Sequence, residues 1–207
     1  MPKKFFPAFI GFLIVIFTLP TSGCTFIFQK GRRTDVEQIF QLKSELSELE
    51  KAKQELEDRL KDEIADKEVK VEMLEKGLVI TFVAEVLFDS GKDKLREVAL
   101  EKLDKIAVVL NTTVKDLNVG IEGHTDNEPI KYSGWKSNWE LSVARALSVL
   151  HYLLDNQGVD PHRLAPMGYG EYHPVTSNET REGRQKNRRV EIVILPRAQK
   201  VAESSAE

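Results

Sequence analysis

The sequence has almost no cysteine, because Cys24 is the single one in a chain of 207 residues. One cysteine cannot form an intramolecular disulfide, so no disulfide framework holds this fold. The chain also lacks an excess of either charge, with 30 lysines and arginines against 33 aspartates and glutamates and a formal net charge of −3. This balance provides no strongly basic surface for a polyanion, and nucleic acid is not an expected partner.

Catalytic motifs are missing as well. The sequence has no Gly-x-Ser-x-Gly nucleophile elbow. Glu122 and Asp126 could be considered as a pair of catalytic carboxylates, but nothing near them in the sequence would raise the pKa of one of the two. The four histidines share no metal-ligand spacing, and they are His124, His151, His162 and His173. We interpret His124 as a residue that orients the turn at Asp126. The sequence therefore predicts no enzyme, no metal and no cofactor.

Charge is absent from Phe5 through Gln29, directly after Lys3 and Lys4. Basic residues followed by an apolar core and small residues are typical of a secretory signal. An uncleaved anchor is the alternative, since this uncharged stretch is long enough to cross a bilayer core of about 30 Å.

The end of this stretch carries Thr21-Ser22-Gly23-Cys24, which resembles the lipobox of bacterial lipoproteins. The resemblance implies cleavage before Cys24 and attachment of lipid to it, with a signal peptide over 1–23 and a lipidated linker over 24–34. Thr25 is not the aspartate that related lipoproteins use for retention in the inner membrane, so we expect an anchor in the outer membrane.

Proline and glycine are absent from Asp35 to Lys76, where charges are dense. Apolar residues recur there at steps of three and four, at Ile39, Leu42, Leu46, Leu49, Leu56 and Leu60. This narrow stripe indicates a heptad seam and predicts a coiled-coil stalk over 35–76, through which copies of the chain form a homo-oligomer. The register slips at Ile64, Val71 and Leu74. A single amphipathic helix that lies back on its own domain is the alternative.

Strand and helix patterns alternate in the remainder, after Gly77, which we expect to cap the stalk helix. The expected strands are 78–83, 117–123, 164–168 and 189–195, and the expected helices are 94–110 and 138–156. This order predicts an α/β sandwich with helices on one face of a sheet, over residues 77–196, with a flexible tail over 197–207.

The helix expected at 138–156 has two distinct faces. Val143, Leu147, Leu150 and Leu154 recur at helical spacing and are expected to pack on the sheet. Arg145 and Asn138 would then lie on the opposite side, next to the turn that carries Asp126. A fixed carboxylate and a fixed guanidinium on neighbouring elements would bind a ligand that has both an ammonium and a carboxylate group. This indicates binding rather than catalysis.

Five motifs follow one another along the second part of the chain. They are Phe88-Asp89-Ser90-Gly91, Gly123-His124-Thr125-Asp126, Asn138-Trp139-Glu140-Leu141-Ser142 with Arg145-Ala146, Gly168-Tyr169-Gly170-Glu171, and Asn187-Arg188-Arg189-Val190-Glu191. In this order they resemble the OmpA C-terminal-like domain, which anchors bacterial envelope proteins to peptidoglycan. The resemblance covers about Leu78 to Pro196 and implies a β-α-β-α-β-β fold.

The resemblance also implies a ligand and its contacts. The ligand would be the diaminopimelate of the peptidoglycan stem peptide. Asp126 and Arg145 correspond to the contacting aspartate and arginine, Asn138 and Leu141 to pocket-lining positions, and Arg189 and Phe88 to positions near the pocket. The chain would then be a periplasm-facing lipoprotein that tethers a membrane to the cell wall without a covalent bond to the wall.

Two other functions stay open. The segment between Asp126 and Asn138 also resembles the flagellar stator B branch, the wall-anchored half of an ion-driven motor. A stator needs a carboxylate within its membrane helix, and residues 5–29 contain none. A coiled-coil scaffold that recruits an envelope protein through residues 35–76 is the other alternative.

Overall fold

The computed structural model describes residues 31–131 and 134–197, so the expected signal peptide, Cys24 and residues 198–207 of the tail lie outside the described residues. The helices are α1 Gly31–Arg59, α2 Lys61–Ala65, α3 Ala84–Leu87, α4 Glu97–Asn111, α5 Asn138–His151 with a π-helical turn Tyr152–Asn156, a 3-10 turn Pro161–Arg163, and α6 Arg181–Asn187. The strands are β1 Val69–Leu74, β2 Gly77–Val83, β3 Asn118–His124, β4 Leu164–Gly168 and β5 Arg189–Leu195.

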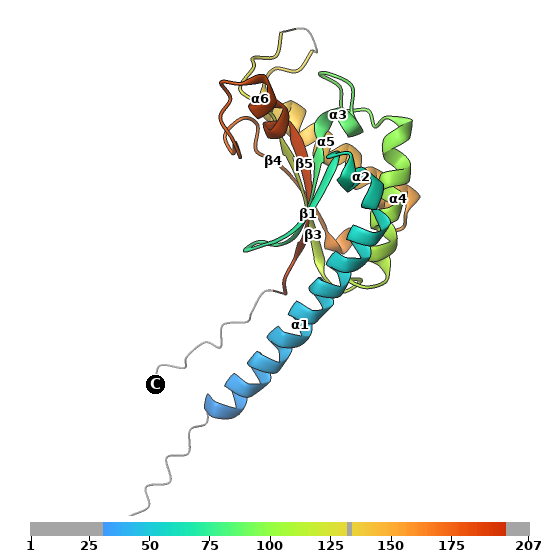
Figure 1. Ribbon diagram of the computed structural model, residues 1–207, viewed down its shortest axis with the longest axis vertical. Coiled ribbons are helices and arrows are strands. Elements are labelled where there is room, and N and C mark those ends of the chain that lie inside the picture. The colour runs from blue at the N-terminus through green and yellow to red at the C-terminus, as the bar shows by residue number, and fades with distance from the viewer. Residues whose placement is uncertain (1–30, 132–133, 198–207) are drawn as a thin grey trace, which may run out of the picture.

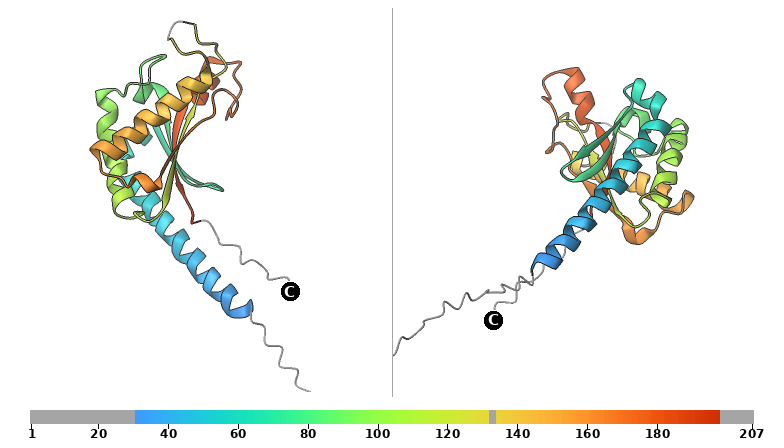
Figure 2. Two further views of the ribbon diagram at one scale, coloured as in Figure 1. Left: turned by 180° about the vertical axis from the view of Figure 1, so that it is seen from behind. Right: turned by 60° about the horizontal axis from the view of Figure 1, so that its bottom comes forward.

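The strands form one mixed sheet in the order β1-β2-β5-β3-β4. Among the described strands β3 and β4 run parallel, and the other neighbours pair antiparallel. Helices α4 and α5 cover one face of the sheet, together with the second half of α1 (Figures 1 and 2). Alternate residues of the strands point into the core between these layers, among them Ile80, Phe82, Val119, Ile121, Ile192 and Ile194. The predicted α/β architecture is confirmed, with β1 as a strand that the sequence analysis does not anticipate.

The first helix differs from the predicted stalk. Side chains at 36–44 are exposed, whereas Leu49, Leu56 and Leu60 are buried in the core of the domain. The apolar stripe is therefore divided between a projecting half (Figure 1) and a half that packs on the chain's own α4 and β1.

No described helix is both long and apolar enough to cross a membrane.

The helical prediction through residue 76 is wrong at its end. Lys67 adopts a positive φ of 59° after α2, and Val69 begins β1. Val71 is buried beside exposed Lys70, and this alternation of valine with polar residues follows the two-residue period of a strand. Gly77 does not cap a helix. It starts β2 after a tight turn at φ 129°, where a Cβ would lie 2.2 Å from the carbonyl oxygen of Ile194.

The buried face of α5 is also different from the predicted one. Val143 and Leu147 are 38% and 37% exposed, while Ser142, Arg145, Ala146 and Val149 face inward. This orientation depends on the missing side chain of Gly123 in β3, because a Cβ at that position would lie 2.0 Å from the Ser142 carbonyl oxygen. The helix therefore lies close against β3 and brings Arg145 inward, to 4% exposure, rather than leaving it on the surface.

Candidate ligand-binding pocket

A cavity of about 510 Å³ lies at the end of β3, beside the start of α5 and next to α3. Its walls come from three segments, within 84–92, 125–131 and 138–145, and from Arg188. The lining residues are Ala84, Glu85, Phe88, Asp89, Ser90, Gly91, Lys92, Thr125, Asp126, Glu128, Pro129, Ile130, Lys131, Asn138, Leu141, Arg145 and Arg188. Acidic and basic side chains both line it, so the cavity suits a ligand with groups of both signs rather than a simple anion or cation.

Five of the six residues predicted for the site line this cavity, namely Phe88, Asp126, Asn138, Leu141 and Arg145. Arg189 does not. Its side chain lies on the other face of the sheet, where Nε donates to Glu191 Oε1 at 2.5 Å and Nη2 donates to the His173 carbonyl oxygen at 3.2 Å. The neighbouring Arg188 reaches the cavity instead.

Arg145 provides the cationic wall of the pocket. Its Nε donates to the Lys92 carbonyl oxygen at 2.9 Å, and its guanidinium carbon lies 5.2 Å from the centre of the Phe88 ring. Burial lowers the pKa of Arg145 to about 10, so the group stays charged at neutral pH. Among the described residues its Nη groups have no hydrogen-bond acceptor. They form a planar fork of the kind that holds a carboxylate through two parallel bonds.

Asp126 provides the anionic wall and is 5% exposed. Its Oδ1 accepts one hydrogen bond, from the Glu128 backbone N at 3.2 Å, and its Oδ2 accepts from Arg188 Nη1 at 2.5 Å. Arg188 is held on its other side by Glu85, whose Oε1 accepts from Nε at 2.8 Å and from Nη2 at 2.5 Å. Asp126 Oδ1 therefore retains a lone pair for a further donor, such as an ammonium group.

Sequence reasoning misses Arg188 and Glu85. In the sequence, the pair Arg188-Arg189 fits either of two interpretations, contact with acidic groups of the wall or a charge cluster at the start of a strand. Strand alternation offers a signal, because Arg189 begins β5 and Arg188, the extended residue before it, must point the other way. Glu85 carries no comparable sequence signal, since only the docking of α3 beside Arg188 gives it a place in the cavity wall.

Asn138 organises the loop that carries Asp126. Its Nδ2 donates to the carbonyl oxygens of Asp126 at 3.3 Å and Glu128 at 3.2 Å, and to Glu171 Oε2 at 2.6 Å. The start of α5 is fixed by Glu140, whose carboxylate accepts from the backbone N of Ser137 at 2.9 Å. The loop and the helix that bear the opposite charges are thus tied to each other.

His124 does not orient the Asp126 turn as the sequence analysis predicts. No described residue forms a hydrogen bond with its ring, which stacks on Tyr169 with the centroids 5.1 Å apart. The turn is held instead through Thr125, whose backbone N donates to the Gly170 carbonyl oxygen at 2.8 Å. His124 faces the other side of the sheet because it lies one residue after Gly123, which faces α5.

Comparisons with known proteins agree with this architecture. Residues 87–188 match the model of the OmpA family. Motility protein B of Bacillus subtilis is 45% identical over 152 residues, which are 72% of this chain and 57% of that protein. The Escherichia coli protein named "Probable lipoprotein YiaD" is 34% identical over 138 residues, 67% of this chain and 60% of that protein.

A solved structure, the cell wall anchor of the T6SS from Pseudomonas aeruginosa, superposes with a TM-score of 0.61 at 36% identity. The similarity covers 68% of this chain and 96% of that one. The chain spans less than two thirds of the length of both curated relatives.

Proposed function

Because the chain belongs to the OmpA family, we propose that it binds peptidoglycan without a covalent bond and recognises the diaminopimelate of the stem peptide in the cavity between Asp126 and Arg145. The domain is a non-enzymatic, peptidoglycan-binding one. The proposed ligand is supported by one observation. The buried carboxylate of Asp126 and the buried guanidinium of Arg145 line the same cavity from neighbouring elements.

Diaminopimelate matches this pair of groups. Its free end carries an amine and a carboxylate on one carbon, so the protein must supply an anion and a cation at a fixed separation. The ammonium would bind at Asp126 Oδ1, and the carboxylate would bind to the Nη groups of Arg145. Charge-assisted hydrogen bonds contribute about 1.5–3 kcal/mol each, so two or three of them support binding on the micromolar scale.

We further propose that the chain tethers a membrane to the wall. Lipid on Cys24 would anchor the N-terminus, in the outer membrane, and α1 would separate the domain from that membrane. Only the part of α1 before the packed Leu49 projects from the domain, and at about 1.5 Å per residue its residues 31–44 span roughly 21 Å. The exposed apolar residues of its first half, Ile39, Leu42 and Leu46, are the part of the predicted seam left for a homo-oligomer.

A second function is favoured by one observation, the 45% identity with Motility protein B. In that reading the chain is a stator B-like wall anchor held by an uncleaved membrane helix. The absence of a carboxylate from residues 5–29 opposes it, because a motor subunit needs an ionisable group within the membrane. Recruitment of an envelope protein through α1 remains an alternative that shares the same wall-binding pocket.

Competition with free amino acids tests the proposed ligand. We expect the chain to sediment with purified sacculi whose stem peptides contain diaminopimelate, and to be released by millimolar free meso-diaminopimelate. 6-Aminohexanoate is the matched control, since its ammonium and its carboxylate lie at opposite ends of the molecule rather than on one carbon, and it should release at least about tenfold less protein. Equal release by both amino acids would contradict recognition of the ammonium and carboxylate pair.

A further inference from the structure

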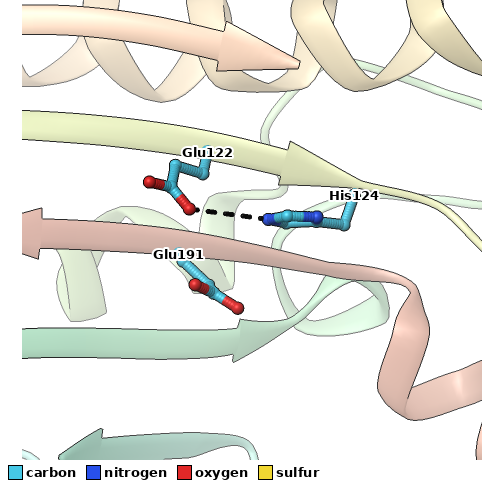
Figure 3. Close-up of side chains that lie close together, drawn as sticks. All are labelled: Glu122, His124 and Glu191. Atoms are coloured by element: carbon cyan, nitrogen blue, oxygen red, sulfur yellow. Dashed lines mark ion pairs between the residues drawn. The ribbon is translucent and has the colours of Figure 1, made fainter. Parts of the chain in front are cut away.

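Three potential metal ligands meet on the sheet face opposite α5. Glu122 and His124 project from β3, and Glu191 projects from β5, where it is paired in register with Glu122. Figure 3 shows the His124 ring edge directed at the Glu122 carboxylate, with Glu191 beside both. One ligand atom of each residue lies within 4.8 Å of the others, and all three side chains are buried.

His124 is the unusual member of this group. Its side chain is 2% exposed, and neither ring nitrogen has a hydrogen-bond partner in the part of the chain that the structure describes. Buried polar atoms normally find a partner, but Nδ1 has none among the described residues and Nε2 lies 3.8 Å from Glu122 Oε2, beyond hydrogen-bond distance, so the ring points to a ligand. Burial also lowers the pKa of His124, which favours the neutral imidazole that metals bind.

A cation already lies between the two carboxylates. Lys76 Nζ is 2.6 Å from Glu122 Oε2 and 2.5 Å from Glu191 Oε2. The Lys76 side chain is 37% exposed and comes from the turn between β1 and β2, so its flexible stem has room to swing into solvent. Both carboxylate oxygens would then be free to accept another positive group.

We propose that Glu122, His124 and Glu191 form a binding site for a divalent transition metal, best suited to Zn²⁺, which the ion enters as the Lys76 ammonium leaves. One imidazole nitrogen and two carboxylate oxygens are ordinary zinc ligands, and three protein ligands leave a fourth position for water. Mg²⁺ and Ca²⁺ prefer sites made of oxygen alone.

The geometry requires only small movements. The ligand atoms of a tetrahedral zinc site lie roughly 3.4 Å apart, given metal–ligand distances of about 2.0–2.2 Å. His124 Nε2 and Glu122 Oε2 are 3.8 Å apart, so rotations of the side chains are sufficient. Arg189 would keep its hydrogen bond to Glu191 Oε1 and orient the second oxygen toward the ion. This proposal departs from the expectation of no metal, which rested on spacing along the sequence and could not include Glu191.

Calorimetric titration of the metal-stripped full chain in detergent with ZnCl₂ tests the site. We expect one ion per chain in the wild type, and binding at least about tenfold weaker in His124→Gln, which keeps the size of the side chain but removes the imidazole. The matched control is His151→Gln, because His151 is an exposed histidine that lies 3.4 Å from Asp155. This control should leave binding unchanged, and Mg²⁺ should not compete.

A second variant tests the displacement of the lysine. Lys76→Met removes the competing ammonium, so Zn²⁺ should bind at least about tenfold more tightly and should raise the melting temperature of this variant more than that of the wild type. Equal Zn²⁺ binding by the wild type and His124→Gln would mean an adventitious ion only, held elsewhere on the chain. That result, or the absence of binding to the wild type, would overturn the proposal whether or not Lys76→Met folds.

Discussion

Arg145→Lys is expected to weaken binding to sacculi by about 30- to 1000-fold, equivalent to about 2–4 kcal/mol, although the substitution keeps a positive charge. The reason is geometric. Arginine presents two parallel donors to a carboxylate, whereas an ammonium is a point charge on a shorter stem. The position is also buried, and burial lowers the pKa of a lysine further than that of an arginine, so part of the charge would be lost.

Asp126→Asn should weaken binding to a similar extent from the other end of the ligand. The asparagine side chain is nearly isosteric, but it gives the ligand ammonium no negative charge to pair with. The Arg188 guanidinium would lose its bond to Asp126 and keep its bonds to Glu85 Oε1. Dissociation constants from co-sedimentation across a range of sacculus concentrations measure both variants, and circular dichroism melting shows that the domain remains folded.

Arg189→Lys is the matched control for this pair of variants. Arg145 and Arg189 are each 4% exposed, so both substitutions disturb a buried guanidinium. Arg189 lies on the opposite face of the sheet and does not line the cavity. Its variant is expected to bind sacculi like the wild type. Loss of binding in Arg189→Lys with retention in Arg145→Lys would contradict the location of the site.

The second large effect concerns stability. Leu56→Ala is expected to lower the free energy of unfolding by about 2–5 kcal/mol, because Leu56 is fully buried against the domain and the truncation leaves a cavity. Leu46→Ala removes the same atoms from a side chain that is half exposed on the same helix. It should change the free energy of unfolding by less than about 0.5 kcal/mol.

Urea unfolding at low protein concentration, followed by tryptophan fluorescence, measures this difference as a shift of the midpoint. Low concentration separates the stability of the domain from any association through the exposed half of α1. Equal shifts for Leu46→Ala and Leu56→Ala would indicate a uniform seam and contradict the division of the helix into a packed half and a projecting half.

Local pattern predicts much of the fold. The strands β2, β3 and β5 are runs of apolar and β-branched residues, and their predicted bounds differ from the observed ones by at most one residue. Strand β1 is missed because Val69 and Val71 also fit a continuation of the helical apolar stripe, and only pairing with β2 decides between the two. The stripe of α1 is predicted correctly, but its partner is not, since a sequence does not show which apolar surface covers Leu56 and Leu60.

The ordered sequence motifs predict part of the candidate site. They do not predict the residues that only tertiary packing brings to the cavity. Asp126, Asn138 and Arg145 follow from the motifs and line one cavity. The burial of Arg145 could not be inferred from the leucine spacing of α5, because the contact between Gly123 and Ser142 sets which face turns inward. Arg188 and Glu85 enter the site through tertiary contacts made across the whole domain.

A crystal structure of the domain with bound meso-diaminopimelate tests the central claim most directly. We expect the ligand's ammonium within hydrogen-bond distance of Asp126 Oδ1, and its carboxylate held by both Nη groups of Arg145. A ligand bound at another surface, or a cavity that contains only solvent at saturating concentration, would contradict the account.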